Sequence, residues 1–308
     1  MNNTKPNILG SVNKLTTRRQ ALANFGLGAL GLGALSAFTP TVQAEDDDGG
    51  GSVSLTSTDV NILNFALNLE YLEAEFYTYA TTGAGIQALG IKVNGRGKLG
   101  DVIIKPNPQV PFGPTIQQYA LEIAADEQNH VRLLRAVLGS RAAARPKIDL
   151  QGSFTAAAQA AGIIGAGQTF DPFADETSFL LAAFIFEDVG VTAYRGAAPL
   201  IVNKTILSAA AGLLGTEAYH ASNIRAHIFE AGAAAQDAAQ KISDLRDTLD
   251  GRGDEDQGVV LNGMANIVPT DAHGLVFPRT AAQVLAIVYF SRTATKGGFF
   301  PNGINTGN

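Results

Sequence analysis

Two Glu-x-x-His motifs lie inside apolar helical stripes, and they constrain this chain more than any other feature. Residues that recur every three and then four positions share one face of a helix. Two such faces are apolar except where Glu127 and His130 interrupt one and Glu217 and His220 interrupt the other. A buried carboxylate without a partner costs several kcal/mol. Each of these glutamates therefore needs a proton, an ion pair or a metal ion.

Four segments combine helical periodicity with helix start and stop signals, and they are residues 59–79, 115–138, 176–200 and 205–229. Ser57 or Thr58 is the expected cap of the first segment. Pro114 precedes the second segment, and Gly139 follows it at a position that favours a left-handed residue. The pattern predicts four helices that bury one face each.

The first and third segments carry a different pair on their inward faces. Glu70 is followed by Tyr77, and Glu187 is followed by Tyr194. The order along the chain is Glu-x6-Tyr and then Glu-x2-His, and it occurs twice. This repeat predicts a site with pseudo-twofold symmetry, in which each half supplies one histidine.

Hardly any Lys or Arg lies on these four faces to neutralise the glutamates, and the 308-residue chain has no cysteine. His and carboxylate groups are then the only strong metal ligands that remain. Two divalent cations would supply the four missing positive charges, and iron and manganese both suit such ligands. The candidate ligands are Glu70, Glu127, His130, Glu187, Glu217 and His220. A hydrogen-bonded network without metal is the alternative.

Four other residues have open roles. Glu73 is either a further ligand or a hydrogen-bond partner of a liganding histidine. Tyr77 and Tyr194 are either core aromatics or groups whose hydroxyls lie beside the metals and act in catalysis. His227, two turns beyond His220, is expected to be a partly exposed polar residue.

The first 44 residues have the pattern of a twin-arginine export signal. Arg18 and Arg19 precede an apolar, glycine-rich run at 23–38, and Ala44 ends a small-x-small exit. A transmembrane anchor is the alternative, but the run is shorter than the roughly 20 residues of a span. We therefore expect export to the periplasm or the medium and no stable membrane span. Residues 45–56 resemble a solvated acidic linker.

The predicted organisation is a bundle at 57–230 followed by a C-terminal extension at 231–308 that packs on it. The loop 82–114 is long and rich in Gly and Pro, and it forms either a small hairpin or a cover for one end. The rest of the chain predicts a short helix at 154–161, an amphipathic helix at 234–249, a surface acidic turn at 253–256 and a helix or strand at 281–289.

Composition limits the partners. The net charge is −6 and no basic run occurs in the body of the chain, so no nucleic acid is expected. The expected partners are metal ions and a small oxidant, either peroxide or dioxygen. The sequence leaves open whether the chain forms a homo-oligomer.

The chain resembles the ferritin-like proteins known as desiccation-related proteins. The resemblance lies in the motifs at 63–73, 126–131, 187–194 and 217–220 and in the tail at 277–280, 283–285 and 297–301. It implies an all-α, ferritin-like four-helix bundle, with a long loop between its first two helices and extra C-terminal helices. In such dimetal bundles two helices each supply a Glu and two supply Glu-x-x-His.

Two functions remain at this point. One is an oxidoreductase that handles peroxide or dioxygen at a di-iron or di-manganese centre under oxidative or desiccation stress. The other is a stress-protective or metal-binding protein without turnover, whose metals are structural.

Replacing Arg18 and Arg19 together by Lys tests the export signal, because the twin-arginine pathway reads this pair. We expect the double variant to accumulate in the cytoplasm and to disappear from the exported fraction, as measured by immunoblotting of cell fractions. Unchanged export would contradict the assignment.

Overall fold

The computed structural model describes residues 54–251 and 256–307. The export signal predicted at 1–44 and linker residues 45–53 lie outside the described residues, as does most of the acidic turn at 253–256.

Four long helices form the bundle, and they match the four predicted segments to within a few residues. They are α2 (Ser57–Thr82), α3 (Pro114–Leu138), α5 (Glu176–Ala197) and α6 (Lys204–Glu230). The largest differences are three residues, at the ends of α2 and α5. At the start of α2, Thr56 rather than Ser57 or Thr58 is the cap. Thr56 and Asp59 form a reciprocal capping box, which satisfies two backbone donors at once.

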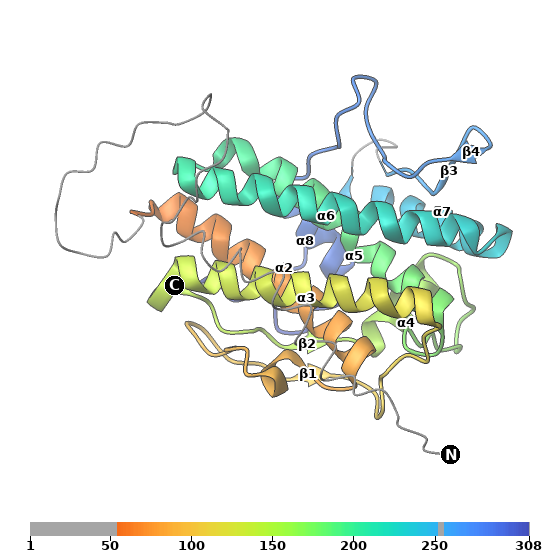
Figure 1. Ribbon diagram of the computed structural model, residues 1–308, viewed down its shortest axis with the longest axis horizontal. Helices are drawn as coiled ribbons and strands as arrows, with labels where there is room; N and C mark the ends of the chain where they lie inside the picture. Colours follow the sequence, from red (N-terminus) through yellow and green to blue (C-terminus); the bar gives the residue numbers. More distant parts are fainter. Residues whose placement is uncertain (1–53, 252–255, 308) are drawn as a thin grey trace, which may run out of the picture. The chain divides into compact units, whose positions relative to one another are not determined.

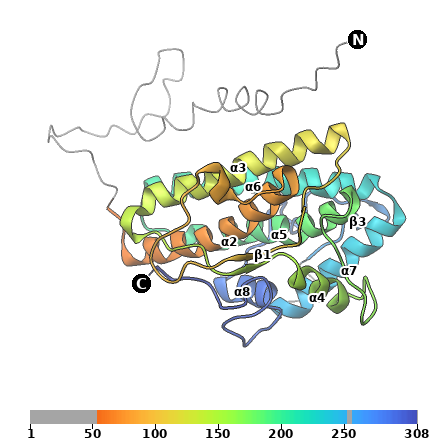
Figure 2. The ribbon, with the colours of Figure 1, turned by 90° about the horizontal axis from the view of Figure 1, so that it is seen from below.

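The helices lie in layers (Figures 1 and 2). In Figure 2, α3 and α6 form one layer and α2 and α5 lie beneath them. On the opposite side α2 and α5 are covered by α4 (Gly152–Ala160), α7 (Ala233–Asp250) and α8 (Ala281–Tyr289). The two middle helices are therefore enclosed on both sides. This explains why their sequences are apolar over most of their surface, whereas α3 and α6 have a polar outer face.

One helical stretch among the described residues is long and apolar enough to cross a membrane. It is Glu176–Leu200, which comprises α5 and the 3-10 turn Ala198–Leu200. In its most apolar window 83% of the residues are buried inside the protein. A core helix enclosed by two layers accounts for that composition.

The loop between α2 and α3 does not form the small hairpin that its sequence allows. It contains a 3-10 turn, Ile86–Leu89, and the strand β1 (Val102–Ile103). This strand pairs in parallel with β2 (Ile148–Asp149), which follows α3 and the 3-10 turn Gly139–Arg141. In Figure 1 the paired segments run along one side of α2 and α3. The strand partner therefore comes from a distant part of the chain.

Gly100 allows these two segments to approach closely. A Cβ atom at this position would lie 2.1 Å from the backbone nitrogen of Lys147. Only glycine permits that approach, and the Gly100 N–H donates to the carbonyl of Arg145 at 2.9 Å.

The C-terminal extension packs on the bundle through helices and through its tail. The segment 281–289, ambiguous in sequence, is the helix α8, and Thr280 and Gln283 form its capping box. The strands β3 (Val260–Leu261) and β4 (Met264–Ala265) form a small antiparallel pair. Near the C-terminus, the backbone N–H of Asn305 donates to Oδ1 of Asn68 at 3.0 Å. The tail is thereby tied to the first helix of the bundle.

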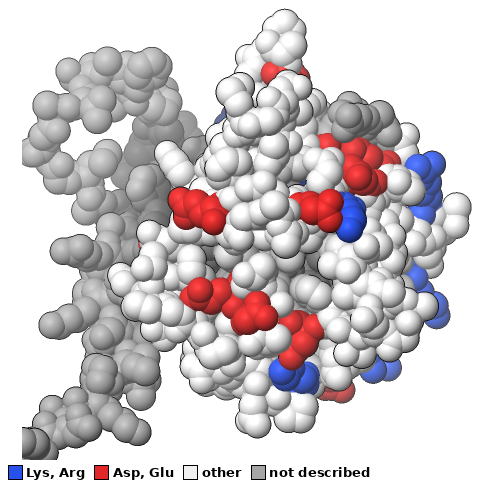
Figure 3. Space-filling view, turned by 90° about the vertical axis from the view of Figure 1, so that its right-hand side faces the viewer, with Lys and Arg blue, Asp and Glu red and all other residues white. Residues whose placement is uncertain are grey.

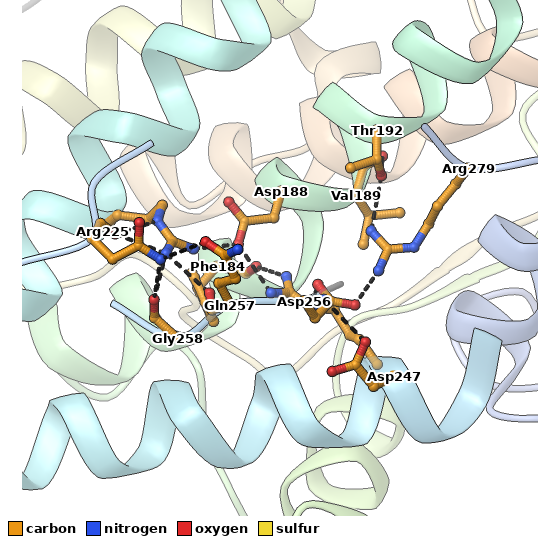
Figure 4. Close-up of polar contacts among 12 residues, drawn as sticks. Phe184, Asp188, Val189, Thr192, Arg225, Asp247, Asp256, Gln257, Gly258 and Arg279 are labelled. Carbon is orange, nitrogen blue, oxygen red and sulfur yellow. Dashed lines mark hydrogen bonds and ion pairs between the residues drawn. The ribbon is translucent and has the colours of Figure 1, made fainter. Parts of the chain in front are cut away.

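A buried network of charges joins α5, α6, α7 and the extension (Figure 4). Arg225 and Arg246 both donate to Oδ2 of Asp188, at 2.7 and 2.9 Å. Arg246 also pairs with Asp256 at 2.9 Å, and Arg279 donates to the same aspartate. The prediction that Asp256 lies at the surface is therefore wrong. Its partners come from helices and loops remote in sequence, so the local acidic run gave no sign of burial.

Charge on the end of the molecule seen in Figure 3 is divided into small groups. Acidic side chains of the described residues form separate groups there, some of them directly beside a basic side chain, with uncharged surface between the groups. Within the described residues, this view has no broad basic patch of the kind that holds a phosphate backbone.

The buried network generates a stability prediction. Replacing Arg246 by Met keeps most of the aliphatic stem but leaves Asp188 and Asp256 short of positive charge, so the free energy of unfolding should fall by about 3–5 kcal/mol. The control is Lys241→Met on the same helix, where an exposed pair with Asp237 is worth about 1 kcal/mol or less. Urea denaturation of both variants measures the difference, and equal losses would contradict a structural role for the network.

Candidate metal centre

All six predicted ligands converge at the middle of the bundle. They form two overlapping groups, each with one atom per residue and all atoms within 4.8 Å of one another. The first group is Glu70, Glu127, His130 and Glu217, and the second is Glu127, Glu187, Glu217 and His220. Glu127 and Glu217 belong to both groups. Each of the four helices therefore contributes, and the two motif glutamates lie between the two histidines.

The distances define two ligand positions. Nδ1 of His130 lies 3.1 Å from Glu70, 3.4 Å from Glu127 and 3.3 Å from Glu217. Nδ1 of His220 lies 3.0 Å from Glu127 and 3.6 Å from Glu187. The two imidazole rings are nearly parallel, with centroids 6.2 Å apart. Both histidines turn the same ring nitrogen toward the shared carboxylates, which is the symmetry that the sequence repeat predicts.

The two tyrosines connect the two halves of the bundle through hydrogen bonds. The hydroxyl of Tyr77 on α2 donates to Oε1 of Glu187 on α5, and that of Tyr194 on α5 donates to Oε1 of Glu70 on α2. The seven-residue spacing on each helix places the hydroxyl at the level of the opposite glutamate. Each tyrosine therefore fixes one oxygen of an outer glutamate and leaves the other oxygen directed at the histidines.

The electrostatics of this cluster call for additional positive charge. Burial raises the pKa of Glu70 to about 8 and raises the pKa values of Glu73 and Glu187 well above their ordinary range. Burial also acts on Glu127, but the adjacent imidazoles outweigh it and lower the pKa of that carboxyl. The pKa of His130 is raised because the attraction of Glu70 and Glu127 exceeds the effect of burial. The raised pKa values mean that these side chains tend to keep their protons, and bound cations would supply the same positive charge.

Orphaned polar atoms give the direct test of whether a metal fits. Among the described residues, six buried atoms of this cluster have no hydrogen bond, and they are both carboxylate oxygens of Glu127 and of Glu217, Oε2 of Glu187 and Nδ1 of His220. Buried polar atoms nearly always have partners in folded proteins. Carboxylate and imidazole together are suitable donors for iron and manganese. The residues present therefore fit a pair of divalent ions.

Glu73 breaks the symmetry. It is 5% exposed, but it belongs to neither ligand group, and none of its contacts with the described residues is a hydrogen bond to a histidine. Its counterpart in the repeat is Gly190, where a Cβ atom would lie 2.5 Å from Oε2 of Glu217. Gly190 therefore leaves the space in which the side chains of Glu73 and Glu217 meet.

One contact in the centre was not predicted. Nε2 of His220 lies 3.3 Å from Oδ2 of Asp126, so a carboxylate orients the ring from its outer side. The acidic residue directly before Glu127 was the feature of the sequence that could have indicated this contact. The equivalent position, before Glu217, holds Thr216. His227 lies outside both groups and pairs with Glu230 at 3.1 Å while it stacks on Tyr119. Its side chain is partly exposed, as predicted.

A four-helix bundle with two Glu-x-x-His helices and two single-Glu helices around one buried centre is the architecture of the ferritin-like proteins. The sequence model of the ferritin-like domain family matches residues 58–230. The chain belongs to this family.

Two relatives match over most of the chain. It is 31% identical over 248 residues to "Desiccation-related protein PCC13-62" of Craterostigma plantagineum. The aligned region covers 75% of this chain and 77% of the relative. The chain is 28% identical over 265 residues to "Ferritin-like catalase Nec2" of Nesocodon mauritianus. The aligned region covers 80% of this chain and 83% of the relative. No solved structure matches the chain significantly.

The shared glutamates generate a prediction about metal content. Glu127→Gln should remove both ions because its carboxylate belongs to both groups, whereas His220→Gln should mainly empty one position. His227→Gln on the same helix is the control and should keep the content of the unaltered protein. Elemental analysis after loading with iron or manganese measures the ratio of metal to chain. Equal metal content in Glu127→Gln and the control would contradict the assignment.

Proposed function

We propose that the protein holds two iron or manganese ions at this centre and uses them to consume hydrogen peroxide. The observation that carries the proposal is the pair of overlapping ligand groups that share Glu127 and Glu217. Sharing two carboxylates would keep the ions close enough to act on one small molecule.

Two further points support peroxide as the substrate. The relative from Nesocodon mauritianus is described as a ferritin-like catalase, and the ligand residues match the family motif. The centre is also buried at mid-bundle, which favours a small substrate. Dioxygen and ferrous iron are the other substrates that such a ligand set can accept, and the assays below distinguish them.

The surroundings of the centre suit this chemistry. Two redox-active ions held by these ligands would supply the two-electron exchange that converts two molecules of peroxide into one dioxygen and two waters. The chain would hold the ligands in place during this exchange. Tyr77 and Tyr194 fix one oxygen each of Glu187 and Glu70, and Asp126 orients His220.

Proton handling falls to Glu73 in this proposal. Its carboxyl is buried next to the ligand groups, and burial with the surrounding glutamates raises its pKa well above the ordinary range. A carboxyl at this position, next to the ligand groups but outside both, is placed to exchange a proton with peroxide as it is reduced. The nearby apolar side chains exclude bulk water from the same region.

A protective role in drying is the second candidate. The relative from Craterostigma plantagineum is described as a desiccation-related protein, and two ions joined to four helices would also hold the bundle together. In that role the metals would raise the stability of the protein, and no turnover would be present. Export to the periplasm or the medium, expected from residues 1–44, is compatible with either role.

Removing the tyrosine hydroxyls separates the two candidates. Tyr77→Phe and Tyr194→Phe should each slow peroxide consumption by about 10–100-fold because an outer glutamate loses the group that fixes it. The melting temperature should change little, since the ring remains in the core. Tyr219→Phe is the control, because Tyr219 adjoins His220 but is 81% exposed.

The rates are measured with an oxygen electrode and by peroxide absorbance after loading with iron or with manganese. If the protein binds both ions fully but consumes neither peroxide nor dioxygen with either metal, the peroxide proposal is contradicted and the protective role remains. Consumption of dioxygen with ferrous iron, and none of peroxide, would make the protein a ferrous oxidase.

A further inference from the structure

An apolar cavity extends from the ligand cluster toward one end of the bundle. All four long helices line it, from Glu73 near the cluster to Ile62 near the start of α2. Eleven residues of helix separate these two, which corresponds to about 16 Å along the bundle axis. The enclosed part of this space amounts to about 40 Å³, a little more than the roughly 30 Å³ that one water molecule occupies.

The two halves of the bundle are packed differently on either side of the cluster. On one side, aromatic rings fill the interior, where Phe179 packs edge-on against Tyr77 at 5.6 Å and against Phe112 at 4.9 Å. On the other side, small residues from three helices face the cavity, among them Ala66, Ala197 and Ala210. The half that carries the cavity, the hollow half, therefore has room for a small apolar molecule, whereas rings fill the other half.

The polar groups of the cavity gather at its inner end. Glu70, Glu73 and Tyr194 lie there, and the rest of the lining consists of Gly190 and apolar side chains. Glu73 is 5% exposed, and no hydrogen bond or ion pair joins its carboxyl to the residues described. The cavity is therefore polar where it meets the ligand cluster and apolar over the rest of its length.

The chemistry of the lining excludes most candidates for that molecule. Water in an apolar cavity lacks the two to four polar partners that hold it, and such cavities stay dry and bind small apolar molecules. Hydrogen peroxide shares this disadvantage because each end needs hydrogen bonds. Dioxygen does not. The cavity reaches the surface where its lining is incompletely buried, at Leu133, which is 40% exposed, and at Ile62 and Val137, which are half-buried.

We infer that this alanine-lined cavity is a dry passage for dioxygen between the surface and the metal centre. The inference rests on the proposed function, in which dioxygen is the product of peroxide disproportionation. In that reaction the apolar product would leave along the passage.

Xenon is the probe for the passage because it is apolar and occupies dry cavities. Crystals of the full-length mature protein under xenon pressure should show anomalous density between Leu213 and Ala66, and this requires no turnover. Ala210→Leu should abolish the xenon site by filling the passage. Ala211→Leu is the matched control, because Ala211 is the next residue on α6 and is exposed. If Ala210→Leu does not fold, Ala197→Leu replaces it.

Oxygen-release measurements provide the second reading. Ala210→Leu should keep its metal content but release dioxygen several-fold more slowly than Ala211→Leu. The inference is overturned by ordered water along the cavity, by the absence of xenon in the unaltered protein, or by equal rates in the two variants. Loss of peroxide turnover with a retained xenon site would instead overturn the proposed function and leave the apolar passage in place.

Discussion

Burying five carboxylates in the middle of an apolar bundle is the constraint on which the rest of this structure depends. Glu70, Glu73, Glu127, Glu187 and Glu217 lie within one small volume, where water cannot screen their repulsion. Two imidazoles and two tyrosine hydroxyls compensate part of this cost, but six polar atoms of the cluster have no hydrogen bond to the described residues. The register of the four helices brings these groups together, because a shift of one residue would turn a carboxylate away from the centre.

The ligand groups obey a pseudo-twofold symmetry that their surroundings do not share. Asp126 orients His220, and the residue in the same place beside Glu217 is Thr216. Glu73 faces Gly190 across the pseudo-axis. Tyr77 packs against Phe179 in the filled half of the bundle, whereas Tyr194 lines the hollow half. The two ligand groups therefore differ in hydrogen bonding and in access, although their residues are related by symmetry.

The segments outside the four helices cover the bundle around this centre. Figure 2 shows α4, α7 and α8 on the side of α2 and α5 that faces away from α3 and α6, and the paired segments β1 and β2 lie along α2 and α3. The charged network of Asp188, Arg225, Arg246, Asp256 and Arg279 fixes the extension to the bundle one residue away from Glu187. The extension is thus anchored to α5 at the residue directly after a candidate ligand.

The sequence by itself determined the four helices, the inward faces and the six residues that meet at the centre. Helical periodicity and short motif spacings are local properties, and they survive without knowledge of the fold. The sequence did not decide between helix and strand for 281–289. The prediction from it that Asp256 lies at the surface was wrong, and it allowed a hairpin in the loop where β1 instead pairs with β2. These depend on partners remote in the chain, such as Arg279 for Asp256 and Ile148 for Val102. The contact of Asp126 with His220 and the alanine-lined cavity were likewise decided only by the tertiary structure, because both arise between helices whose relative rotation no local pattern records.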